Sequence, residues 1–185
     1  MSRRTDFWIN AIAFEIVWLA AVGGAGHGLW WAGPLALSAF FVYQVSASPL
    51  ARADIALAAI ACAVGFVADS VLARSGVVHY AASLPSAGFA PLWIVALWAN
   101  LALTLNHSLA FLKQQLPLAA VLGAIAAPLS YFVADRAWHA VALAPPLAVT
   151  LLALAASWAV LMPLLAAAAR WLQPQVPAAT GAALP

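Results

Sequence analysis

Long apolar runs alternate with short polar or glycine-rich turns along the whole chain. Each run has the length, roughly 20 residues, that an α-helix needs to cross a lipid bilayer. The pattern therefore predicts an all-α fold, a polytopic integral membrane protein with one six-transmembrane-helix domain over residues 1–172. The helices are expected at about residues 7–24, 30–45, 52–72, 91–112, 116–134 and 145–171, and the Pro- and Ala-rich residues 173–185 are expected to form a flexible C-terminal tail.

The run over residues 91–112 carries polar residues inside an apolar segment. Asn100, Thr104 and His107 follow one another at spacings of four and three. On a continuous helix they share one face with Trp93 and Phe111. Because a polar group in hydrocarbon costs several kcal/mol unless it finds a partner, this stripe is expected to line the inside of the bundle.

Composition supports the membrane interpretation. Of 185 residues, 67% are hydrophobic and 6% are charged, against roughly a quarter charged in soluble domains, so a water-soluble surface is excluded. The first run resembles a targeting signal, since Arg3 and Arg4 precede it. However, Asn10, Glu15 and Trp18 interrupt it, so we expect a retained first helix.

The seven basic residues predict the orientation of the bundle. With six crossings and a cytoplasmic N-terminus, five of them lie inside and two outside, in agreement with the positive-inside rule. The five are Arg3, Arg4, Arg52, Lys113 and Arg170, and the two are Arg74 and Arg136. Both termini are therefore expected to be cytoplasmic. The scattered charges give no basic cluster, so no nucleic acid partner is expected.

Glu15 is the most informative ionisable residue, because it falls near the middle of the first helix. A carboxyl group at that depth must be protonated or paired, and Asn100 lies at a comparable depth on the fourth helix. Asn10 lies less deep on the first helix. Two interpretations remain open: these groups join helices by hydrogen bonds, or they form a substrate or proton site.

Asp69 shares a helix face with Gly65 and Cys62, whose small side chains allow close helix packing and favour an interior position for the carboxyl group. Under the predicted orientation, several ionisable groups gather at the outer side, where they could build a metal site or an acid/base constellation. These groups are His27, His79, His139, Asp69, Asp135 and Arg136. No HExxH motif or other diagnostic spacing occurs, so no metal site and no cofactor are predicted, and solvated interface groups are the simpler interpretation.

These considerations give two sets of candidates. Candidate catalytic residues are Glu15, His107 and Asp69. Candidate substrate-binding residues, chosen because deep aromatic rings beside polar groups suit a chain-like ligand, are Asn10, Trp18, Trp98, Asn100, Thr104 and Tyr131. Space filling between helices is the alternative role of the deep Trp18, Trp98 and Trp158.

The motifs PLW, LW and TLNHSL, followed by PLSY, resemble an uncharacterised bacterial membrane family, the domain of unknown function 2878. They cover Pro91, Trp93, Leu97, Trp98, Thr104 to Ser108 and Pro128 to Tyr131, and the similarity extends over nearly the whole chain. Ala127 and Ala134 stand where the family tends to have glycines. The resemblance implies a multi-pass protein of the bacterial inner membrane, with an association to lipid or fatty-acid modification.

Three functions stay open at this point. The first is an accessory protein or enzyme of lipid or fatty-acid modification with a polar cavity inside the membrane. The second is a small proton- or ion-coupled transporter that uses Glu15, although no internal repeat is visible. The third is a structural partner in a membrane complex. The expected partners are accordingly membrane lipids or another membrane protein.

Overall fold

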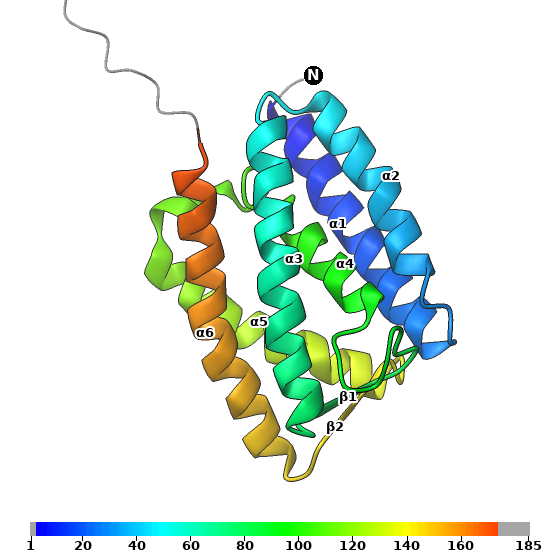
Figure 1. The fold of residues 1–185 in the computed structure, drawn as a ribbon. Helices are drawn as coiled ribbons and strands as arrows, with labels where there is room; N and C mark the ends of the chain where they lie inside the picture. The colour runs from blue at the N-terminus through cyan, green and yellow to red at the C-terminus, as the bar shows by residue number, and fades with distance from the viewer. Residues whose placement is uncertain (1–2, 174–185) are drawn as a thin grey trace, which may run out of the picture.

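The computed structural model describes residues 3–173, which form a helical bundle (Figure 1). Its helices are α1 (Arg3–Gly26), α2 (Ala32–Ala47), α3 (Ala51–Arg74), α4 (Leu92–Ala102), α5 (Leu116–Arg136) and α6 (Leu147–Trp171), with a short 3₁₀ helix η1 (Ala110–Gln114). The predicted all-helical class is confirmed. Residues 174–185 of the predicted tail lie outside the described residues.

Four of the described helices, α1, α3, α5 and α6, are long and apolar enough to cross a membrane. The other two are shorter, with 16 residues in α2 and 11 in α4, whereas a perpendicular crossing needs about 17 or more. Large apolar side chains are exposed on the long helices, among them Ile16, Val67, Ile125 and Leu152. An exterior of this kind is stable in lipid, so the chain is a membrane protein.

The predicted continuous helix over residues 91–112 is wrong. The α-helix ends at Ala102, an irregular stretch follows over residues 103–109, and η1 begins at Ala110. The reason is competition for hydrogen bonds: the Asn10 side chain binds the Leu103 carbonyl and the Ser108 amide, both in this stretch. The polar stripe of the prediction is consequently divided between α4 and the irregular stretch.

The helices form two groups. In the first, α4 lies among α1, α2 and α3, and in the second α5 packs along α6. Figure 1 shows α6 beside α3 on one flank of the molecule and α1 with α2 on the other. The close packing of α5 on α6 depends on Gly123, where a Cβ atom would come 2.5 Å from the Trp158 carbonyl oxygen.

A small β-ladder joins the two groups at one end of the bundle. The strands β1 (Val78–Tyr80) and β2 (Val141–Leu143) pair antiparallel, with His79 opposite Ala142. β1 belongs to the connection from α3 to α4, and β2 to the connection from α5 to α6. Val78 and Tyr80 of the first connection are buried, because the ladder turns them into the bundle.

Candidate functional site

A cavity of about 360 Å³ lies between the two helix groups. Its volume is within the range of small-molecule sites, about 300–1,000 Å³. The lining is mostly apolar and aromatic and comes from α1, α4, α5 and α6; it includes Phe14, Trp18, Trp93, Leu97, Trp98, Leu101, Ala127, Tyr131, Trp158 and Met162. We call this space the central cavity.

The central cavity reaches the lipid-facing surface of the bundle between α1 and α5. Glu15 of α1 and Leu122 and Ala126 of α5 line it and are themselves exposed. No hydrogen bond or ion pair to Glu15 occurs within the described part of the chain, residues 3–173. The carboxyl group of Glu15 therefore lies at the mouth of an apolar cavity, near the middle of a membrane-spanning helix.

Two stacked tryptophans separate the central cavity from a second cavity. The rings of Trp98 and Trp158 lie nearly parallel, with centroids 4.6 Å apart. Both residues line the central cavity and also a space of about 320 Å³ between α3 and α6, which we call the α3–α6 cavity. The ring pair is thus the wall between the two cavities.

Asp69 of α3 lies behind this wall and accepts three hydrogen bonds. Its Oδ2 accepts from Trp98 Nε1 over 2.6 Å, and its Oδ1 accepts from the Tyr80 hydroxyl over 2.6 Å and from the Tyr131 hydroxyl. Only 1% of Asp69 is exposed. Asp69 lines the α3–α6 cavity, while Tyr131 lines the central cavity.

Tyr80 completes this cluster from β1. Burial, followed by the neighbouring Tyr131 and the Asp69 carboxylate, raises the pKa of Tyr80 above its ordinary value. The Tyr80 hydroxyl therefore keeps its proton and acts as a donor to Asp69. The β-ladder, which fixes β1 in place, consequently positions one of the three donors around this carboxyl group.

A second buried carboxylate, Asp54, lies near the start of α3. It accepts from Ser48 Oγ over 2.7 Å, from His107 Nε2 over 2.9 Å and from Asn106 Nδ2 over 2.9 Å. Asp54 is fully buried, and 16% of the His107 side chain is exposed. A carboxylate can only accept, so Nε2 of His107 carries the hydrogen of this bond. Neither cavity is lined by the pair.

Lys113 adds a positive charge to this cluster. Its Nζ donates to Asn106 Oδ1 over 2.9 Å, and only 4% of the residue is exposed. Burial lowers the pKa of Lys113 below its ordinary value, and the nearby Asp54 carboxylate opposes that shift. The cluster therefore combines one buried anion with a cation that loses stability through burial.

Asn10 holds the irregular stretch from the opposite side. Its Nδ2 donates to Gln44 Oε1 and to the Leu103 carbonyl, both over 3.0 Å, and its Oδ1 accepts from Ser108 Oγ over 2.6 Å. Every one of these groups is buried. Asn10 thus replaces hydrogen bonds that the backbone loses where the helix ends, while Asp54 accepts from the side chains of the same stretch.

The candidates predicted from sequence separate into two sets. Glu15, Trp18, Trp98 and Tyr131 line the central cavity, and Asp69 lies directly behind it. The others form internal hydrogen bonds and line neither cavity; they are Asn10, Asn100, Thr104 and His107.

The expected contact between Glu15 and Asn100 is wrong. Asn100 Nδ2 donates to the Phe14 carbonyl over 3.0 Å, and Asn100 is fully buried while Glu15 is exposed. Asn100 approaches the backbone of α1 from α4, on the buried side of α1, whereas the Glu15 side chain lies on its exposed side. Thr104 likewise uses its hydroxyl to bind the Leu101 carbonyl.

Two residues of these clusters, Asp54 and Tyr80, are not among the candidates predicted from sequence. Asp54 lies in the first turn of α3, where an acidic residue is ordinarily explained by the helix dipole. Tyr80 lies in a connection between two helices. The one available signal for Asp54 is the polar run TLNHS, since so many polar groups at this depth require a charged partner.

The outer-side histidines do not assemble into a site. His27 donates from Nδ1 to the Gly23 carbonyl over 2.8 Å, while His79 and His139 are exposed. Asp135 pairs with the adjacent Arg136 at 3.3 Å. Among residues 3–173, no three His, Cys, Asp or Glu side chains gather as metal ligands would. The alternative of a metal centre here gains no support.

Comparison with known proteins agrees with the motifs in the sequence. A family model described as "Protein of unknown function (DUF2878)" matches residues 7–164, and the chain belongs to this family. The resemblance drawn from the PLW, TLNHSL and PLSY motifs is thereby confirmed. No curated protein and no solved structure matches the chain.

Proposed function

We propose that this member of the DUF2878 family is a multi-pass inner-membrane protein of bacteria that binds a lipid chain and serves lipid or fatty-acid modification, as an enzyme or its accessory protein. The observation that supports the proposal is the central cavity. It is apolar and aromatic, has the volume of a ligand site, and opens between α1 and α5 toward lipid. A lipid chain can enter such a cavity from the bilayer without crossing water.

The polar groups of the central cavity are few and specific. Glu15 lies at the mouth, Ser130 and Tyr131 lie on α5, and the remaining lining is apolar or aromatic. A site with a small number of polar groups orients a mainly apolar ligand. In this proposal Glu15 meets the polar part of the lipid, and Tyr131, held by Asp69, marks the inner wall.

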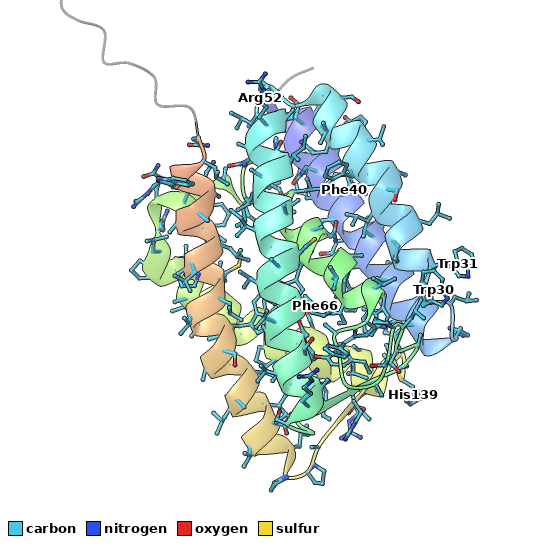
Figure 2. All side chains as sticks on the ribbon, in the orientation of Figure 1. Trp30, Trp31, Phe40, Arg52, Phe66 and His139 are labelled. Carbon is cyan, nitrogen blue, oxygen red and sulfur yellow. The ribbon has the colours of Figure 1, made fainter. Side chains whose placement is uncertain are left out.

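We also propose that the chain crosses the membrane six times, with both termini in the cytoplasm. The distribution of five basic residues on one side and two on the other supports this orientation. In Figures 1 and 2, α1 begins and α6 ends toward the end of the bundle that carries Arg52, and His139 lies toward the opposite end. The short α4 crosses together with the irregular stretch, whose backbone groups are satisfied inside the bundle, and η1 follows at the cytoplasmic boundary.

Lipid binding is tested by purifying the protein from membranes and identifying the co-purified lipid by mass spectrometry. Ala126→Phe places a ring at the mouth of the central cavity and should strongly reduce the bound lipid. Leu129→Phe, on the same helix and lipid-facing with 58% exposure, is the matched control and should retain it. Equal amounts of lipid on both variants would contradict the site.

The role in lipid modification is tested separately by comparing membrane lipids of a deletion strain with those of complemented strains. The complementing proteins are wild type, Glu15→Gln and His107→Ala, expressed at equal levels. We expect a lipid species that disappears on deletion, returns with wild type and stays absent with Glu15→Gln. An unchanged lipid profile under several growth conditions would overturn this role and favour transport or assembly.

A further inference from the structure

The α3–α6 cavity contains a carboxylate that lacks a positive partner. Within residues 3–173 the ion pairs are His107 with Asp54 and Arg136 with Asp135, so no cation of this part of the chain lies within 4 Å of Asp69. The groups around Asp69 are two phenols and an indole. They donate hydrogen bonds but carry no charge, so Asp69 is a neutral acid without a bound cation and a carboxylate when a ligand supplies the positive charge.

One acceptor position of Asp69, which lines this cavity, is left unused by the described residues. A carboxylate offers about four lone-pair positions. Two hydrogen bonds reach Oδ1, and only Trp98 Nε1 reaches Oδ2 among the described residues. Trp98 can only donate, so it uses one lone pair of Oδ2 and leaves the other unused. The carboxylate is therefore oriented and still able to accept from a ligand.

The remaining lining of the α3–α6 cavity suits a cation attached to an apolar chain. One face of Trp98 rests on Gly65 and the other stacks on Trp158, so the outer face of Trp158 is the electron-rich surface that remains to attract an ammonium group. Ser157 Oγ already donates to the Ala153 carbonyl, so its lone pairs are free to accept from a further donor. Val71 and Val160 line the rim and are about 60% exposed, which opens the cavity toward lipid.

The depth of Asp69 agrees with the position of a lipid amine. Asp69 precedes the end of α3 at Arg74 by five residues, which corresponds to about 8 Å along a helix. It thus lies near one boundary of the membrane-spanning segment, where headgroups meet acyl chains. An amine at this level can reach Asp69 while its chains stay in the bilayer.

We propose that the α3–α6 cavity binds the ammonium group of a long-chain amine or aminolipid, with Asp69 as its counter-ion. This inference does not rest on the lipid role of the central cavity, because the two sites lie on opposite sides of the Trp98–Trp158 wall. A neutral or anionic lipid of the same chain length lacks the charge that Asp69 requires.

The test measures dissociation constants by native mass spectrometry of the full chain released from neutral detergent. The probes are phosphatidylethanolamine and its N-acetylated form, which keeps the chains and phosphate but lacks the ammonium charge. Wild type should bind phosphatidylethanolamine about tenfold more tightly than the N-acetylated form. A second pair, hexadecylamine and hexadecanol, distinguishes the sources: preference in both pairs indicates recognition of ammonium alone, and preference in the first pair only indicates an aminolipid headgroup.

Two variants decide whether Asp69 and its cavity cause the preference. Asp69→Asn should bind the charged and neutral probes equally, whereas Asp135→Asn should keep the tenfold preference, because Asp135 is a partly buried carboxyl group that pairs with Arg136 and lines neither cavity. Ser157→Leu narrows the cavity without altering Asp69 and should weaken phosphatidylethanolamine binding, which keeps the test valid if Asp69→Asn does not fold. Absence of a preference in wild type, or its survival in both cavity variants, would overturn the proposal. Ala126→Phe should leave this binding unchanged, so the proposals for the two cavities are tested independently.

Discussion

The indole of Trp98 lies directly against the backbone of α3 at Gly65. A Cβ atom at Gly65 would overlap the ring at Cγ, Cδ1 and Cδ2. Gly65 precedes Asp69 by one helical turn, so the ring that rests on the glycine also reaches the carboxyl group, with Nε1 2.6 Å from Oδ2. The wall between the two cavities therefore holds its position because residue 65 is glycine and has no Cβ atom.

Gly65→Ala should force Trp98 away from α3. Small-to-large changes in a close-packed interior cost about 1–3 kcal/mol, so we expect a lower melting temperature in detergent and a changed tryptophan fluorescence spectrum. Gly88→Ala is the control, because nothing lies within 4 Å of a Cβ atom at that position. Equal melting temperatures for the two variants would show that Trp98 adopts another rotamer without loss of stability.

The helices were predictable because the apolar runs are long and end at glycine, proline or charge. The predicted segment 52–72 corresponds to α3, and 116–134 corresponds to α5. The largest difference at a terminus among these long helices is at α1, expected from residue 7 and beginning at Arg3. Hydropathy predicts these helices because a segment in lipid must satisfy its backbone hydrogen bonds within itself, which an apolar helix does without specific contacts to other helices.

The irregular stretch and the ladder were not predictable, because distant residues determine them. Residues 103–109 contain neither glycine nor proline, and the helix ends there because Asn10 and Asp54 bind its polar groups. Likewise β1 exists only because β2, some 60 positions later, pairs with it. The interior position of Asp69 could be inferred from Gly65, whereas its tyrosine and tryptophan donors could not.

Asp54→Ala should release the irregular stretch. The change leaves the Ser48, Asn106 and His107 donors without their acceptor, and breaking a buried ion pair costs about 3 kcal/mol or more. Asp135→Ala, which removes a more exposed ion pair with Arg136, should cost about 1 kcal/mol or less. Thermal unfolding in neutral detergent measures both. If the two variants melt together, the Asp54 cluster does not stabilise the bundle.

Lys113 should make stability depend on pH on the alkaline side. Burial holds its pKa in the folded protein below the ordinary 10.5, so the folded state binds fewer protons than the unfolded state in that window. Stability must then rise as pH increases from the folded pKa toward 10.5, and fall in the reverse direction. Lys113→Met keeps the apolar stem, cannot titrate, and should lack this slope.

The comparison for Lys113 is the difference between wild type and Lys113→Met in melting temperature, followed from neutral pH upward. Taking the difference removes the contribution of other groups that titrate in both proteins. A constant difference across the range would mean that Lys113 keeps an ordinary pKa when folded. A wild-type advantage that grows at lower pH would contradict the direction of the shift.

The proposed orientation places His79 outside the cell and Gln114 in the cytoplasm. Both side chains are exposed, at β1 and at the end of η1, so a cysteine at either position should react with a maleimide. The only native cysteine, Cys62, is partly buried and is replaced by alanine in the background. Spheroplasts expose the outer face of the inner membrane, and inverted vesicles expose its cytoplasmic face. A membrane-impermeant maleimide should therefore label His79→Cys in spheroplasts and Gln114→Cys in inverted vesicles. Labelling of Gln114→Cys in spheroplasts together with His79→Cys in inverted vesicles would reverse the orientation. Labelling of both cysteines from one side would reject six crossings, since the two positions would then lie on the same face of the membrane.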